Sequence, residues 1–160
     1  MAVKKILQLG DPRLNEISEE LEIHETVLKN ETFLDLKDTM LEFRRIYNCG
    51  RAIAAPQIGV QKRMIYMNIE GKETCFINPE ITHKSEEMFE LWDDCMSFPD
   101  LLVKVKRHNN IKVKYFDENF IENFTEFDSG LSELFQHEYD HLDGILATMK
   151  AIDENSIKKK

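Results

Sequence analysis

The sequence contains no run that approaches the roughly 20 uncharged apolar residues needed to cross a bilayer. Residues 1–14 also carry too few apolar side chains for the core of a secretory signal peptide. Cysteine is scarce, and the odd count of three, Cys49, Cys75 and Cys95, excludes a fully paired disulfide framework. We therefore expect a cytoplasmic protein with reduced thiols and no membrane partner.

Basic residues are in the minority, with 21 Lys and Arg against 30 Asp and Glu, so the net charge is −9. Phosphate backbones repel such a chain, and a specific nucleic-acid partner is not expected. The basic run Lys158–Lys160 is expected to be a solvated tail. No linker or repeat divides the chain, and 42% apolar with 32% charged residues suit one folded domain over residues 1–160.

Two segments have helical patterns. Apolar side chains in residues 31–47 recur at spacings of three and four, which predicts an amphipathic helix. We expect Asn30 as its N-cap and Gly50 just beyond its end. A second helix is predicted over residues 129–142, with Ser129 as N-cap. The apolar stripe of the first helix is Phe33, Leu36, Met40, Phe43 and Tyr47.

Between the helices lie short β-type runs separated by turn residues, such as Glu70-Gly71. Strands so close together in the chain pair antiparallel, because parallel pairs need long crossovers. The expected fold is therefore α+β, with antiparallel sheet packed on two helices. The predicted strands are 64–69, 74–77, 89–92, 101–105 and 111–116.

The second helix contains the pattern H-E-x-x-H at residues 137–141. His137 and His141 lie one turn apart on the same helix face, so both imidazoles can reach one metal ion. Glu138 falls beside them and can take a proton from water. A catalytic site needs a third protein ligand from elsewhere. Asp140 is either an orienting residue for the site or a member of a surface ion pair.

Two further segments are unusual for a core or a surface. Residues 93–99 place Cys95 in a polar, turn-like stretch directly after a strand, whereas Cys49 and Cys75 are expected to be small buried hydrophobes. Residues 50–59 are rich in small side chains, which allow a substrate backbone to approach closely.

Taken together, these segments resemble the peptide deformylases. That family carries a G-x-G-x-A-A-x-Q loop, an E-G-C-L-S turn and a Q-H-E-x-D-H helix in this order. The chain has GRAIAAPQ at residues 50–57, DDCMS at 93–97 and QHEYDH at 136–141. Residues 6–14 and Arg107 are also similar to the family, so the resemblance covers nearly the whole chain. It implies the deformylase fold, with antiparallel sheets around a central H-E-x-x-H helix and an N-terminal helix.

The resemblance also implies a mechanism. Glu138 would be the general base, and Gln57 with the backbone N–H of Met96 would hold the oxyanion. The substrate would be the N-formyl-methionyl start of new polypeptides, with formate released and a transient contact with the ribosome possible in principle. The cofactor would be one divalent metal ion, iron(II) in the cell, with zinc, nickel or cobalt able to replace it. The implied metal ligands are Cys95, His137 and His141.

The chain departs from the family pattern at four positions in its substrate cleft: Arg51, Ala52, Asp93 and Asp94. We expect Arg51, Ala52, Asp94 and Arg107 to contact substrate. Arg51 and Asp94 carry opposite charges, and we expect them to pair across the cleft rim with a contribution of about 0 to 1 kcal/mol. The residues expected to help line the methionine pocket are Ile53, Met96, Leu134 and Phe135.

Two alternatives remain at this point. Because of Arg51, the chain could be a deformylase-like amidase that acts on a different N-acyl or N-formyl compound. It could also be a catalytically idle metal-binding or ribosome-associated domain. Turnover of formyl-Met peptides and of formylated peptides with other first residues tests the first alternative, which predicts little preference for Met. Measurable turnover in the unmodified protein excludes the second alternative.

Overall fold

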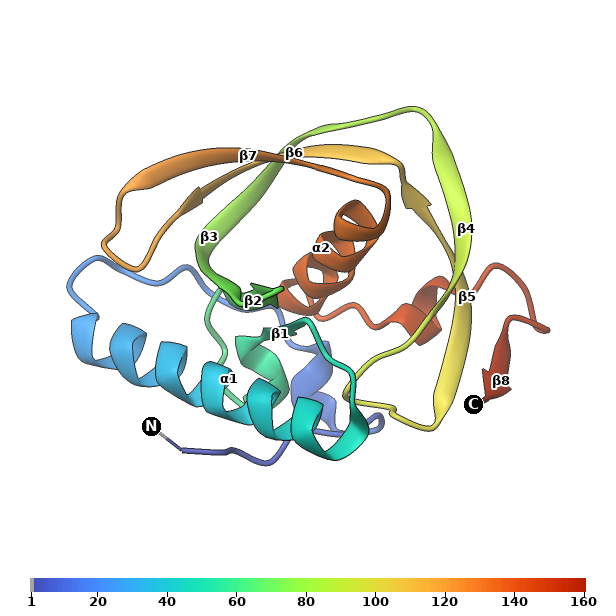
Figure 1. The fold of residues 1–160 in the computed structure, drawn as a ribbon, viewed down its shortest axis with the longest axis horizontal. Coiled ribbons are helices and arrows are strands. Elements are labelled where there is room, and N and C mark those ends of the chain that lie inside the picture. The colour runs from blue at the N-terminus through green and yellow to red at the C-terminus, as the bar shows by residue number, and fades with distance from the viewer. Residues whose placement is uncertain (1) are drawn as a thin grey trace.

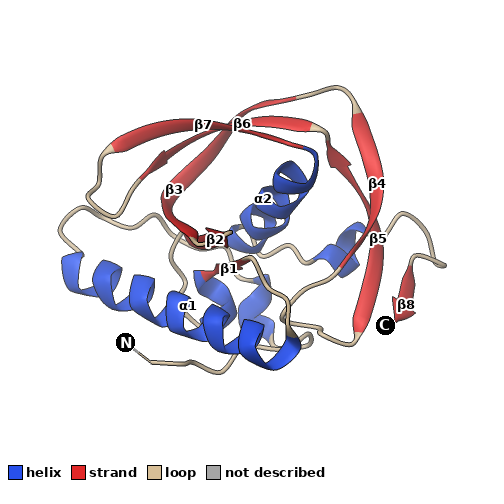
Figure 2. Ribbon diagram, viewed as in Figure 1, coloured by secondary structure: helices blue, strands red, loops and turns tan. Residues whose placement is uncertain are grey.

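The computed structural model describes residues 2–160, and within them two α-helices combine with two antiparallel sheets (Figures 1 and 2). One sheet has the strand order β1-β2-β3-β6-β7, and the other has the order β4-β5-β8. The helices are α1 (Thr26–Tyr47) and α2 (Ser129–Leu142), with short 3-10 helices η1 (Pro12–Asn15), η2 (Ala55–Ile58) and η3 (Ala147–Lys150). The strands are β1 (Ala52–Ala54), β2 (Met64–Ile69), β3 (Lys72–Lys84), β4 (Met88–Asp93), β5 (Leu101–His108), β6 (Asn110–Phe116), β7 (Glu122–Asp128) and β8 (Ile157–Lys159).

Both sheets curve around α2, while α1 packs on the opposite side of β1 and β2 (Figure 1). Side chains alternate along a strand, so β2 serves two cores. Met64 and Tyr66 pack with Leu36 and Met40 of α1, whereas the intervening Ile65 packs in the core beside α2. The predicted α+β fold with antiparallel sheets is confirmed.

The enclosure of α2 explains why its polar residues are buried, including Gln136, His137, Glu138 and His141. The amide of Gln136 fixes the helix to the end of β5. Its Oε1 accepts the backbone N–H of His108 at 3.0 Å, and its Nε2 donates to the His108 carbonyl at 2.9 Å.

Several predicted boundaries need correction. The first helix begins at Thr26 with Glu25 as its N-cap, so Asn30 lies inside it. The apolar pattern is weak in this first turn, because Val27 is exposed and Leu28 is only partly buried against the core. The second helix has the predicted bounds, but Asp128 is its N-cap and Ser129 has φ of 49°. Strand β7 was not predicted, since its polar sequence ENFTEFD alternates only weakly, and pairing with β6 places it in the sheet.

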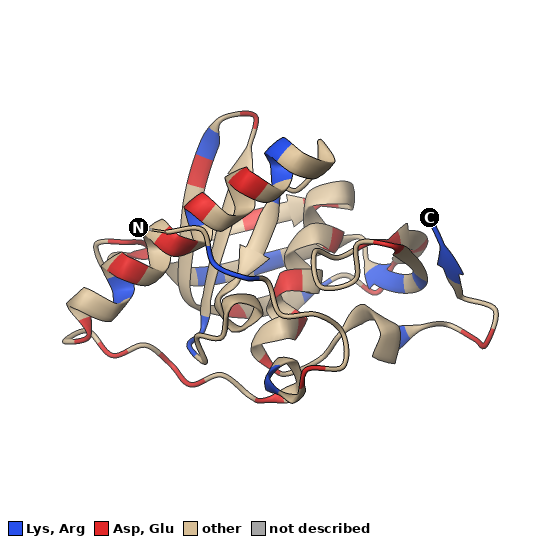
Figure 3. Cartoon of the chain, turned by 90° about the horizontal axis from the view of Figure 1, so that it is seen from below, with Lys and Arg blue, Asp and Glu red and all other residues tan. Residues whose placement is uncertain are grey.

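The C-terminal lysines are not a free tail. Strand β8 pairs with β5, and Lys158 Nζ lies 4.0 Å from the centroid of the Trp92 ring. Lys160 Nζ lies 3.1 Å from Asp94 Oδ2. This basic strand stands out at the end of the chain (Figure 3). Within residues 2–160, no helix is both long and apolar enough to cross a membrane.

Candidate active site

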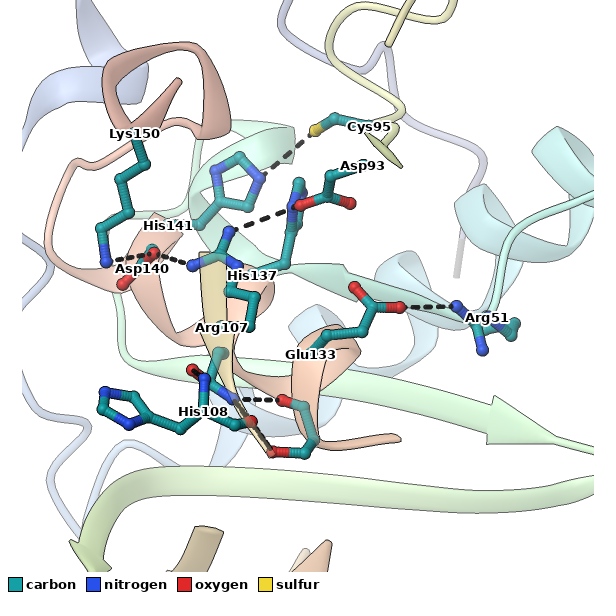
Figure 4. Close-up of polar contacts among 12 residues, drawn as sticks. Arg51, Asp93, Cys95, Arg107, His108, Glu133, His137, Asp140, His141 and Lys150 are labelled. Atoms are coloured by element: carbon teal, nitrogen blue, oxygen red, sulfur yellow. Dashed lines mark hydrogen bonds and ion pairs between the residues drawn. The ribbon is translucent and has the colours of Figure 1, made fainter. Parts of the chain in front are cut away.

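Three ligand-type side chains meet where α2 faces the loop after β4. The candidate ligand atoms of Cys95, His137 and His141 all lie within 4.8 Å of one another, and all three residues are buried. Cys95 Sγ is 3.4 Å from His141 Nε2 (Figure 4). A thiolate with two imidazoles suits borderline-soft divalent ions such as zinc or iron(II). The structure therefore brings together the three residues that the sequence analysis named as ligands.

Asp93 orients one of these histidines. Its Oδ2 lies 2.8 Å from His137 Nδ1, which leaves the Nε2 of that ring for a metal ion. Burial disfavours a charged imidazole, yet the Asp93 carboxylate and the Cys95 sulfur raise the pKa of His137 well above its ordinary value. Asp93 is one of the four positions at which the chain differs from the family pattern. In the structure its carboxylate holds the His137 ring in place through this hydrogen bond.

Beneath this pair lies a buried charge network (Figure 4). The Arg107 side chain is 2% exposed, and its Nη1 donates to Asp140 Oδ2 at 2.6 Å, while Nη2 lies 3.4 Å from Asp93 Oδ2. Lys150 Nζ is 3.0 Å from the same Asp140 oxygen. Burial raises the pKa of Asp93, but the charges of His137 and Arg107 outweigh it and hold the pKa below its usual value.

This placement changes two expectations. Arg107 lies below the ligands and does not line the cavity, because both neighbouring carboxylates hold its guanidinium inward. We therefore do not assign it the expected contact with substrate. Asp140 pairs with Arg107 and with the half-exposed Lys150, so it supports the site through Arg107.

Gln57, in η2 directly after β1, presents its amide N–H groups to the site. Its Oε1 accepts the backbone N–H of Ala54 at 3.0 Å, which fixes the orientation of the amide. Its Nε2 then donates to Ser97 Oγ at 3.1 Å and lies 3.6 Å from Cys95 Sγ. Met96 forms part of the cavity wall, and the oxyanion role of its backbone N–H stays a prediction.

Glu138 provides an acid–base group beside the ligands. It is 4% exposed, and burial raises its pKa to about 7. Among the described residues, its Oε1 and the Nδ1 of His141 are buried without a hydrogen-bond partner. Buried polar atoms are rarely left unpaired. An unpaired carboxylate oxygen next to three donor atoms fits a site built around a metal ion and a reacting water molecule.

A cavity of about 170 Å³ opens beside these residues. Of the expected substrate-binding residues, Arg51, Ala52 and Asp94 line it. Of the expected methionine-pocket residues, Met96 and Leu134 line it. Ile53 and Phe135 do not, because both are fully buried in the two cores.

The expected pair between Arg51 and Asp94 is wrong. Arg51 Nη2 lies 3.2 Å from Glu133 Oε1, and Asp94 pairs instead with Lys160. Glu133 was not among the predicted site residues, although its position four residues before His137 places both on one helix face. Cys75 is buried as expected, but Cys49 is exposed and lines the cavity, because it follows the end of α1.

A sequence model described as polypeptide deformylase matches residues 3–156. The peptide deformylase of Pseudothermotoga lettingae is 40% identical over 145 residues, which are 90% of this chain and 80% of that protein. The peptide deformylase of Heliobacterium modesticaldum is 36% identical over 158 residues, covering 97% and 98% of the two chains. The crystal structure of peptide deformylase from Thermotoga maritima superposes with a TM-score of 0.87 at 29% identity, covering 96% of this chain and all of that one. The chain belongs to the polypeptide deformylase family.

Proposed function

We propose that residues 1–160 form one catalytic domain that removes the N-formyl group from the N-terminal methionine of newly made polypeptides and releases formate. The observation that carries this proposal is the convergence of three metal-type donors within 4.8 Å beside the cavity that Glu138 lines, where the Oε1 of Glu138 is buried without a hydrogen-bond partner among the described residues. Membership of the deformylase family agrees with it. We place this reaction in the cytoplasm, where new chains are made, and keep a transient contact with the ribosome as a prediction.

The residues present fit a single divalent ion, held by Cys95, His137 and His141. Such an ion supplies Lewis-acid chemistry and lowers the pKa of water from about 15.7 towards 7. We propose iron(II) as the ion used in the cell, with zinc, nickel or cobalt as replacements, because one thiolate and two imidazoles suit these borderline ions.

The protein side chains divide the remaining work. Glu138 accepts a proton from the attacking water molecule while the water oxygen bonds to the formyl carbon. The amide N–H of Gln57 hydrogen-bonds the negative oxygen that develops on that carbon. Glu138 then returns the proton to the amine nitrogen as the carbon–nitrogen bond breaks. The second proton of the water stays on the product, so the step yields formic acid and a free N-terminal amine. Formic acid then ionises to formate, and its proton passes to the amine or to solvent, so atoms and charge balance.

The direct test combines metal analysis with product detection. We expect protein purified without oxygen to contain about one divalent ion per chain and to release formate from a formyl-Met peptide. A protein that carries the ion but releases no formate would contradict the proposed reaction. The same experiment identifies the ion.

Replacing Gln57 with Leu should lower kcat by about a hundredfold to a thousandfold, the usual cost of losing one oxyanion donor. The matched control is Ser97→Ala, which removes a hydrogen-bond partner of the same amide but leaves its N–H groups in place. Steady-state formate release compares the two. Equal losses in both variants would mean that Gln57 acts only through local packing.

An enzyme loaded with iron(II) should lose activity in air faster than one loaded with nickel, since ferrous ion and a thiolate ligand both oxidise. Activity is followed over time in parallel aerobic and oxygen-free samples. Identical decay of the two metal forms would show that oxidation elsewhere, such as at the exposed Cys49, causes the loss.

A further inference from the structure

We propose that the Arg51–Glu133 ion pair selects the first side chain of the substrate, so that the cavity accepts a polar side chain of methionine's length about as well as methionine. The inference rests on the proposed function, because it concerns the residue that bears the formyl group. It assigns a specificity role to Glu133 and a defined partner to Arg51.

The ion pair forms part of the cavity wall next to the metal ligands. Arg51 precedes β1, and Glu133 lies on α2 four residues before His137, so Glu133 and His137 are neighbours on one helix face. Their charged atoms are 3.2 Å apart, with side chains 51% and 10% exposed (Figure 4). The carboxylate is thus held inside the cavity, and the guanidinium reaches towards its mouth.

Substrate geometry brings the first side chain to this wall. Its Cβ is only three bonds from the formyl carbon, hence within about 4 Å of it. The formyl carbon must reach the space beside Glu138 and His137 to react. The cavity beside these two residues is also lined by Glu133 and Leu134 of the same helix, so a first side chain that enters it comes close to the ion pair.

The charges at this level favour a polar side chain. An arginine has five N–H donors, and the hydrogen bond found for Arg51 among the described residues is the one to Glu133. A methionine side chain would displace water from both charged groups, and the only hydrogen-bonding atom that it offers in exchange is its thioether sulfur, a weak acceptor. A glutamine side chain has nearly the same length, and it offers a carbonyl to Arg51 and an NH₂ group to Glu133.

The test compares formyl-Met-Ala-Ser with formyl-Gln-Ala-Ser on the nickel-loaded enzyme. For the unmodified enzyme, we expect kcat/KM for the methionine peptide to be at most about three times that for the glutamine peptide. In Arg51→Met/Glu133→Leu, an apolar wall replaces the ion pair. The ratio of kcat/KM for the methionine peptide to that for the glutamine peptide should then rise by about tenfold or more, which is the discrimination that apolar contacts in a pocket usually give. The control is Lys104→Met/Glu90→Leu, which removes an exposed pair outside the cavity and should leave the ratio unchanged.

Circular dichroism establishes that the double variant is folded. If it is not, Arg51→Met alone serves, since this half-exposed side chain can be replaced without opening a core, and its loss should also raise the ratio. A preference of the unmodified enzyme for methionine above about threefold, or an unchanged ratio in the variants, would overturn the inference. Absence of turnover with every formyl peptide would instead refute the proposed function. Peptide hydroxamates that carry a methionine or a glutamine side chain test the same specificity without turnover. The ratio of their dissociation constants should change between the unmodified enzyme and the variants as the ratio of kcat/KM does.

Discussion

Replacing Glu138 with Gln is expected to lower kcat by about a thousandfold or more, because the reaction loses the group that carries the proton from water to the leaving amine. Glutamine has the same shape but cannot accept or return a proton. The raised pKa of about 7 suits the carboxyl group to both steps near neutrality. Because Glu138 is not one of the three ligand residues, the variant should bind its metal ion as the unmodified enzyme does.

Formate release and metal content are measured on the same sample. The control is Glu154→Gln, the same substitution at an exposed position outside the cavity. Loss of the metal ion from Glu138→Gln would assign the residue a structural role. A fully loaded variant with kcat within about tenfold of the unmodified enzyme would remove Glu138 from proton transfer.

Replacing Arg107 with Met should lower the free energy of unfolding by about 3 to 5 kcal/mol, the cost of leaving buried charges without their partner. Asp93 and Asp140 both lose the guanidinium, and each is buried. The comparison is Lys150→Met, which removes a partner of the same Asp140 carboxylate. The Lys150 side chain is 42% exposed, so its loss should cost only about 0 to 1 kcal/mol.

Urea unfolding in the presence of a chelator measures both variants without a contribution from bound metal. Similar small losses would show that His137 and Lys150 hold the two carboxylates well enough alone. Arg107→Met should also weaken metal binding by about tenfold to a hundredfold, because Asp93 then orients His137 less firmly. A metal competition assay measures this second effect.

The metal-site residues could be predicted from sequence, whereas their supporting contacts could not. The spacing of His137 and His141 is a local property of a helix, and the family motif supplies Cys95. The contact between Asp93 and His137 joins residues 44 positions apart, so it depends on how the three-stranded sheet packs against α2 through β5. No sequence pattern connects such a pair.

Charge pairing shows the same limit. Arg51 and Asp94 lie in two segments that both line the cavity, as expected. Each has a nearer partner, however. Arg51 pairs with Glu133, which was not among the predicted site residues, and Asp94 pairs with Lys160 of the predicted solvated tail. The fold was easier to predict, because a helical apolar pattern reveals α2 and a continuous apolar run reveals β2, while the polar β7 depends on its neighbour β6.

The origin of the three ligands in different elements links metal loading to folding. Both histidines belong to α2, but Cys95 follows β4 of the three-stranded sheet. This sheet and the five-stranded sheet curve around the helix from different sides (Figure 1). A partly folded chain in which α2 alone has formed offers two ligands and binds a metal ion weakly. Tight capture therefore waits until the sheet that carries Cys95 has packed on the helix, and ion uptake can serve as a kinetic signal for that stage of assembly.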